Sequence, residues 1–112
     1  MTVNEQKAYN LIGIAKKAGK VISGTDMVAD RIREKKNAVK VVLISRDASE
    51  NTMKKIINTS TYYKVLAIKI NIDKTMLAKI TGSMGERSVI GITDDGLAKA
   101  IVSYVTDETE RK

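Results

Sequence analysis

The residues best suited to chemistry lie between Lys16 and Lys36, where seven of 21 residues are basic. Within this stretch, 23-SGTD-26 forms a glycine-marked turn that leads into what reads as a helix. A helix N-terminus presents free N–H groups and a partial positive charge, and a glycine there lets a ligand backbone come close. Basic side chains around such a turn indicate a site for phosphate groups, as in nucleic acids.

Two known phosphate-binding motifs do not fit this turn. A P-loop needs a Lys-Ser/Thr pair directly after its second glycine, whereas Gly24 is followed by Thr25 and Asp26. Gly19 and Gly24 do not form the dinucleotide motif G-x-G-x-x-G either. The simpler alternative is a permissive turn glycine with Ser23 or Asp26 as a helix cap, and the turn alone favours that alternative.

The composition excludes most catalytic classes. The 112 residues contain no cysteine and no histidine, which rules out disulfides, thiolate metal sites, thiol nucleophiles and imidazole catalysis. The carboxylate pair Asp94-Asp95 reads as the start of a helix. We therefore expect no enzyme activity, no metal site and no cofactor.

The net charge of +7 is concentrated near the N-terminus. Residues 1–40 hold nine basic and four acidic residues (9 − 4 = +5), whereas residues 41–112 hold eleven and nine (11 − 9 = +2). Such a surface attracts RNA or DNA, although a solvated lysine face that serves solubility explains the charge equally well. Four tyrosines without Phe or Trp argue against a base-stacking platform for single strands, so structured RNA fits better.

The elements that position these residues follow from hydrophobic periodicity. We expect helices over 5–18, ending at Gly19, and over 25–35, where Ser23, Thr25 and Asp26 offer caps and Met27 extends an apolar stripe. Strands are expected over 20–22, 39–45, 63–70 and 88–93. Further helices are expected after Ser49, from Asp73 through 80, and over 95–105. In the helix after Ser49, we expect Met53, Ile56 and Ile57 to face inward. The predicted fold is an α/β three-layer α-β-α sandwich with a mixed four-stranded sheet.

The domain organisation is simple. Prolines and linkers are absent, and we expect one domain over 1–112 with a polar C-terminal tail from about residue 106. No apolar run approaches the roughly 20 residues of a bilayer span, and the N-terminus lacks a signal-peptide pattern. A cytoplasmic monomer with no membrane contact is therefore expected.

Three separated blocks carry a family resemblance: K-A-G-K-x-x-x-G-T from Lys17, V-V-L-I-S-x-D-A-S from Val41 and L-x-K-x-x-G from Leu77. Together they resemble the kink-turn RNA-binding ribosomal protein superfamily, which includes the L-seven-Ae and L-thirty-e proteins and their bacterial relatives. The resemblance covers about residues 5–105. The resemblance implies a non-catalytic, ribosome-associated protein. Its expected partner is ribosomal RNA or another structured RNA, with ribosomal proteins as neighbours.

The resemblance also implies the binding site. Gly24 matches the glycine that the family sets against the RNA backbone, Thr25 and Val28 match family positions, and the loop 82–88 supplies a second wall. With the basic residues that can contact phosphates, the expected RNA-binding residues are Lys16, Lys17, Lys20, Gly24, Thr25, Asp26, Met27, Arg31, Gly82, Ser83, Met84 and Gly85. An exposed loop methionine without a role explains Met84 equally well.

At three contact positions the chain departs from the family. Asp26 stands where the family has Asn or Lys, Met27 where it has Glu or Gln, and Asp30 where the better-known binders have Lys. Carboxylates repel phosphates, and methionine offers no base-edge hydrogen bond. The alternative function is thus a protein-interaction or scaffold module that kept the fold but lost tight kink-turn binding.

Overall fold

The structure, a computed structural model, describes residues 2–35, 37–83 and 85–110, with side chains through residue 106. In chain order the elements are α1 (Val3–Lys17), β1 (Val21–Ser23), α2 (Thr25–Glu34), β2 (Val41–Ile44), α3 (Glu50–Tyr62), β3 (Leu66–Lys69), α4 (Lys74–Thr81), β4 (Val89–Ile92) and α5 (Asp95–Glu110). The predicted order of elements is confirmed. The expected strand over 63–70 is too long at its start because Tyr63, Lys64 and Val65 cap the end of α3 through bonds to its last turns. α5 runs beyond the expected end at 105.

The four strands form one mixed sheet in the order β1-β4-β2-β3. β4 is antiparallel to both β1 and β2, whereas β2 and β3 are parallel. Every residue of the central strands β2 and β4 is buried, as their β-branched runs predict. The carboxyl ends of β1, β2 and β3 therefore lie at one edge of the sheet, where β4 begins.

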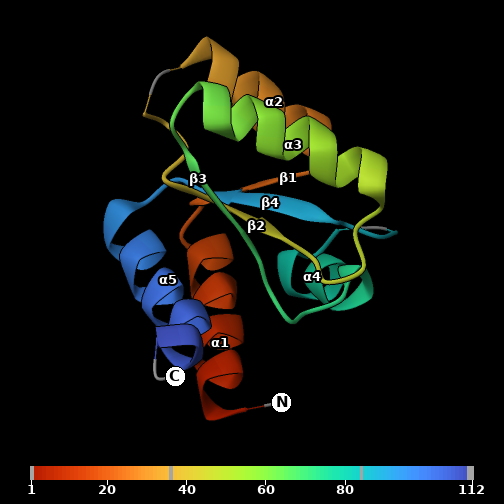
Figure 1. The fold of residues 1–112 in the computed structure, drawn as a ribbon. Coiled ribbons are helices and arrows are strands. Elements are labelled where there is room, and N and C mark those ends of the chain that lie inside the picture. The colour runs from red at the N-terminus through yellow and green to blue at the C-terminus, as the bar shows by residue number, and fades with distance from the viewer. Residues whose placement is uncertain (1, 36, 84, 111–112) are drawn as a thin grey trace.

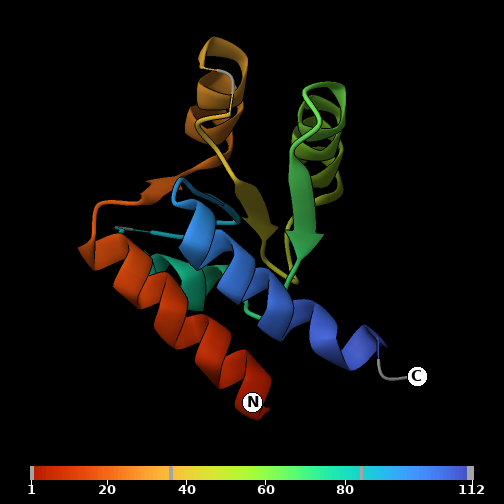
Figure 2. The same ribbon diagram turned by 90° about the vertical axis from the view of Figure 1, so that its left-hand side faces the viewer.

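Helices cover both faces of the sheet, so the predicted three-layer sandwich is confirmed (Figures 1 and 2). α2 and α3 lie on one face over a core that includes Val28, Val42 and Ile56. α1, α4 and α5 lie on the other, over a core that includes Ile12 and Ile101. Each layer is apolar on the side toward the sheet, which holds the sandwich together.

Local caps fix where the helices begin and end. The Ser49 hydroxyl accepts a hydrogen bond from the Thr52 N–H (3.2 Å), and the Asp73 carboxylate accepts one from the Met76 N–H (2.8 Å), as expected for N-caps. Gly19, with φ of +73°, ends α1 as predicted. The expectation for Ile57 is wrong, since its side chain is exposed while Ile56 is fully buried.

Candidate nucleic-acid interface

Gly24 occupies the turn between β1 and α2 in a conformation that glycine adopts far more readily than other residues, with φ 101° and ψ 141°. Its N–H donates to the Val89 carbonyl (2.9 Å), and its carbonyl accepts from the Val28 N–H (3.0 Å). A Cβ built on Gly24 would meet no heavy atom within 4 Å. The turn thus needs glycine for its backbone, and the space above it is open to a ligand.

The first turn of α2 has no side-chain cap. The prediction that Ser23, Thr25 or Asp26 caps this helix is wrong, because Gly24 itself takes the N-cap position and has no side chain to accept a hydrogen bond. The free N–H groups at this helix end therefore lack the side-chain acceptor found at the starts of α3 and α4.

The Asp26 side chain turns instead to α3, where it forms an ion pair and accepts a hydrogen bond from Lys55. That hydrogen bond, followed by the positive charge of Lys55, holds the pKa of Asp26 below its ordinary value. The Asp30 carboxylate lies 2.5 Å from the Arg33 guanidinium on the same helix. Both carboxylates that depart from the family pattern are thus paired with a cation.

Met27 does not belong to the apolar stripe of α2. Its side chain is 57% exposed, whereas Val28 and Ile32 are buried against the sheet. The prediction that Met27 extends the buried stripe is wrong, because the residue points outward beside Asp26 at the open start of the helix. This leaves an apolar, polarizable side chain on the surface next to the Gly24 turn.

The loop 82–88 reaches the same edge of the sheet. Gly82 ends α4 with φ of +66°, and Gly85, also left-handed at +80°, is exposed. The Ser83 N–H donates to the Ala78 carbonyl (2.9 Å), which ties the start of the loop to α4. The loop then enters β4 at Val89, whose carbonyl accepts from Gly24. Met84 and Lys36 lie outside the described residues.

The basic cluster at the end of α1 lies apart from the turn. Lys16 and Lys17 are in the last turn of α1, and the Lys20 carbonyl accepts from the Thr93 N–H at the opposite end of β1 from Gly24. Four residues at about 3.3 Å each put Lys20 roughly 13 Å from Gly24. Arg31 is exposed and lies about 10 Å along α2 from its start. At the end of the sheet where β4 begins, the structure places Gly24, Thr25, Asp26 and Met27 at the start of α2 and Gly82, Ser83 and Gly85 in the loop before β4. It places Lys16, Lys17 and Lys20 at the opposite end of β1, and Arg31 further along α2.

Several cations near the carboxyl ends of β1, β2 and β3 were not identified from the sequence. Lys55 reaches Asp26 from α3, across 29 positions in the chain. Lys74, at the start of α4, lies 3.5 Å from Glu86 of the loop 82–88, and its carbonyl accepts from the Arg87 N–H (3.2 Å). Such pairs arise only from the tertiary fold, and no local motif marks them.

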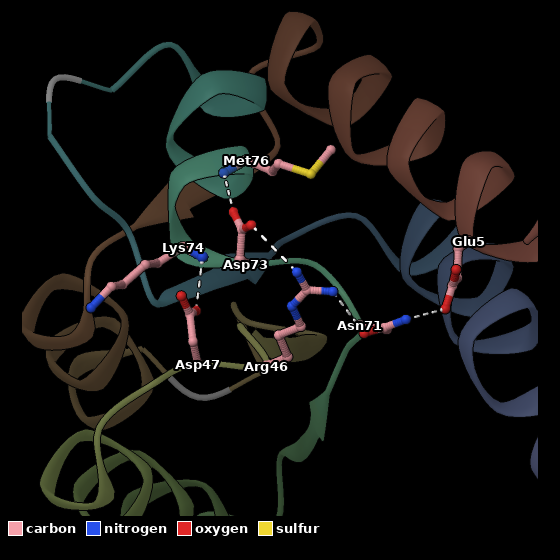
Figure 3. Close-up of polar contacts among 7 residues, drawn as sticks. All are labelled: Glu5, Arg46, Asp47, Asn71, Asp73, Lys74 and Met76. Atoms are coloured by element: carbon pink, nitrogen blue, oxygen red, sulfur yellow. Dashed lines mark hydrogen bonds and ion pairs between the residues drawn. The ribbon is translucent and has the colours of Figure 1, made fainter. Parts of the chain in front are cut away.

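A polar network holds the loops that follow β2 and β3 (Figure 3). Arg46 donates to Asn71 (3.2 Å) and lies 3.6 Å from the Asp73 carboxylate, while Asn71 donates to Glu5 of α1 (2.6 Å). The hydrogen bond from Asn71 is the largest of the effects that lower the pKa of Glu5. The network joins the carboxyl ends of two strands to α1 and α4, and so fixes the edge beside the candidate interface.

Two classes of site are missing from the part of the chain that the structure describes. It contains no group of acidic, histidine or cysteine side chains arranged to hold a metal ion. None of its helices is both long and apolar enough to cross a membrane.

Comparison with known proteins adds independent information. Residues 6–102 match the model of the Ribosomal protein L7Ae/L30e/S12e/Gadd45 family. The chain is 44% identical over 97 residues to "RNA-binding protein YlxQ" of Enterococcus faecium, which covers 86% of this chain and 88% of that protein. It is 38% identical over 97 residues to the protein of the same name from Bacillus subtilis strain 168, covering 87% and 93%.

Two solved structures share the fold. A protein with unknown function from Bacillus halodurans C superposes with a TM-score of 0.80 at 26% identity, covering 88% of this chain and 96% of that one. The Giardia lamblia 15.5kD RNA binding protein superposes with a TM-score of 0.71 at 15% identity, covering 98% and 92%. The low identity of the second match limits it to a likeness of fold.

Proposed function

The chain belongs to the Ribosomal protein L7Ae/L30e/S12e/Gadd45 family, and from that premise we propose that it is a non-catalytic RNA-binding protein. Its target is structured RNA with a kink-turn-like bend, bound by the start of α2 and the loop 82–88. The observation that carries this proposal is the Gly24 turn, which combines a conformation that strongly favours glycine, open space and an uncapped helix start with a second glycine-containing loop at the same end of the sheet.

The charges at this site suit RNA better than the sequence suggests. Asp26 is paired with Lys55 and Asp30 with Arg33, so neither carboxylate presents an uncompensated charge to a phosphate. Exposed Met27 offers an apolar contact to a base or ribose where the family has a hydrogen-bonding side chain. We propose that this site reads the shape of the RNA backbone more than base edges.

The cellular setting forms part of the same proposal. The family supports a ribosomal or other structured RNA as the partner, in the cytoplasm and in association with the ribosome. The absence of cysteine and histidine from the sequence supports a role without catalysis. Neighbouring ribosomal proteins would then contact a monomer through faces away from α2.

Crosslinking in cells, followed by sequencing of the bound RNA, tests this function. We expect reads that cluster on a bent structured RNA, and a strong loss of those reads for Gly24→Glu. Gly24→Ala is the matched control because it imposes the same backbone strain without a charge. Recovery of no specific RNA would instead favour the scaffold alternative.

A further inference from the structure

A groove opens at the other end of α2, away from the proposed kink-turn site. α2 and α3 run side by side on one face of the sheet, and their last turns lie at the same end (Figure 1). Between them is a groove of about 400 Å³ with an apolar floor of Ile32, Val39 and Val65. This volume falls in the range of roughly 300–1,000 Å³ that is typical of small-ligand sites.

Two tyrosines form one side of the groove. Tyr62, the last residue of α3, is 79% exposed, and Tyr63 is 41% exposed. Their rings lie edge to face, with centroids 4.9 Å apart and an interplanar angle of 73°. Half of the four tyrosines of the chain are therefore paired on its surface, and the largely exposed Tyr62 ring offers the greater area for stacking.

The rim of the groove is basic. Arg33, Lys35 and Lys64 line it, and no Asp or Glu does among the described residues. Arg33 is paired with Asp30, but Lys35 and Lys64 have no ion-pair partner in the part of the chain that the structure describes. The groove thus presents two uncompensated ammonium groups beside two aromatic rings, which are the features that bind single-stranded nucleic acid.

Lys64 holds its position at a conformational cost. Its φ is +60°, and the Val65 N–H donates to the Ser60 carbonyl (2.8 Å), which is the helix-ending pattern in which glycine usually takes this place. This left-handed backbone is strained for lysine but not for glycine. The folded state alone would favour glycine here, yet the chain has a cation that faces the groove.

We propose that this groove binds an unpaired nucleotide of single-stranded RNA, with a base stacked on the Tyr62–Tyr63 pair and phosphates held by Lys35 and Lys64. The site goes beyond the proposed kink-turn function, because it lies about 15 Å along α2 from the Gly24 turn. Although the chain has only four tyrosines and no Phe or Trp, the fold gathers two of the tyrosines at one place.

Binding of a fluorescently labelled single-stranded uridine octamer tests the proposal. We expect Tyr62→Ala with Tyr63→Ala to weaken binding roughly five- to 150-fold, the effect of losing one stacked base. Lys64→Gly should reduce the salt slope of log K by about 0.7 while raising Tm, because the strained backbone is relieved. Lys99→Gln, on the other face of the sheet, makes an equal change in charge and should leave octamer binding nearly unchanged.

A second RNA separates this proposal from the kink-turn function. A blunt-ended kink-turn RNA should bind Gly24→Glu more weakly than the wild type and bind the double tyrosine variant normally. The octamer should bind Gly24→Glu normally and bind the double tyrosine variant more weakly. If the wild type ignores the kink-turn RNA but binds the octamer through the tyrosines, the kink-turn function fails and the groove stands. Equal octamer affinity of wild type and double tyrosine variant overturns the groove, including the case in which a protein partner covers it.

Tyrosine emission gives a readout that altered folding would not imitate. The chain has no tryptophan, so a Tyr9→Phe, Tyr104→Phe background leaves Tyr62 and Tyr63 as its emitting groups. Stacked bases should quench this emission in proportion to bound octamer. Emission that stays constant while the octamer binds would place the RNA elsewhere and overturn the proposal.

Discussion

The two ends of α2 differ in how their charges are compensated. At the start, Asp26 is paired with Lys55, the turn is glycine, and the exposed side chain is Met27. At the far end, Lys35 and Lys64 have no ion-pair partner among the described residues and lie beside two exposed tyrosines. Positive charge alone therefore does not locate the proposed kink-turn site, which lies at a turn whose acidic side chains are paired with cations.

Gly24→Glu should have the largest effect on the binding of kink-turn RNA at the start of α2. A carboxylate placed in the open space above the turn would meet RNA phosphates, and we expect affinity for kink-turn RNA to fall about 100-fold or more. Both Gly24→Glu and Gly24→Ala should lose about 1–3 kcal/mol of stability, because φ is +101°. Titration and thermal unfolding of both variants check this. Equal affinity losses would mean that strain, and not contact with RNA, explains the effect.

Restoring the family side chains at the start of α2 should raise the affinity for kink-turn RNA. The triple variant Asp26→Asn, Met27→Glu, Asp30→Lys should bind a standard kink-turn RNA more than about tenfold tighter, since one base-edge contact is worth about 1–3 kcal/mol. Met27 is exposed, so its replacement removes no core packing.

The control for this variant is Asp95→Lys on α5. It makes the same change in net charge as the triple variant (+1 − 1 + 2 = +2) at an exposed position on the other face of the sheet from α2. Titrations at one fixed salt concentration compare all three proteins. If the natural sequence already binds as tightly as the triple variant, the departures from the family pattern are harmless.

The α1 cluster should have a smaller and less selective effect. Lys16→Gln, Lys17→Gln and Lys20→Gln together should weaken bent and straight RNA alike, because these residues lie at the opposite end of β1 from Gly24. Each lost phosphate contact should reduce the slope of log K against log salt by about 0.7 to 0.9. An unchanged slope would identify the cluster as a solvated face that serves solubility.

The smallest effect concerns Asp26 itself. Its pKa should lie below the ordinary value in the wild type and return toward it in Lys55→Gln, which carbon-detected NMR of the carboxyl group measures. Because the folded pKa is depressed, the pairing stabilises the fold above the unfolded pKa of about 3.9, and this is lost as pH falls through the folded value. An Asp26 pKa that does not respond to Lys55→Gln would show that the pair does not form in solution.

Much of the fold was predictable because its signals are local. Val41–Ile44 and Val89–Ile92 are apolar and buried at every position, as expected for strands that are covered on both faces. Ser49, Asp73 and Gly19 mark helix ends with the expected geometry. The errors arose where local signals compete. Tyr63 has strand propensity, but it is the C-cap of α3, and its N–H donates to the carbonyls of Thr59 and Thr61.

The site was less predictable because its polar contacts are long-range. Asp26 and Thr25 are good capping residues, yet Gly24 takes the cap position and Asp26 pairs with Lys55 of another helix. The gathering of Tyr62, Tyr63 and Lys64 around Lys35 likewise depends on how α2 packs on α3. Composition counts tyrosines and charges, but only the fold decides which of them share a surface.

Amide NMR mapping with a blunt-ended kink-turn RNA tests whether the start of α2 and the loop 82–88 bind the RNA. We predict that the largest shifts of the protein amides occur at Gly24, Thr25 and Ser83, where the helix start and the loop 82–88 meet at β4. Shifts that are confined to 16–20 or to 62–64, with Gly24 and Ser83 unmoved at saturating RNA, would contradict the account.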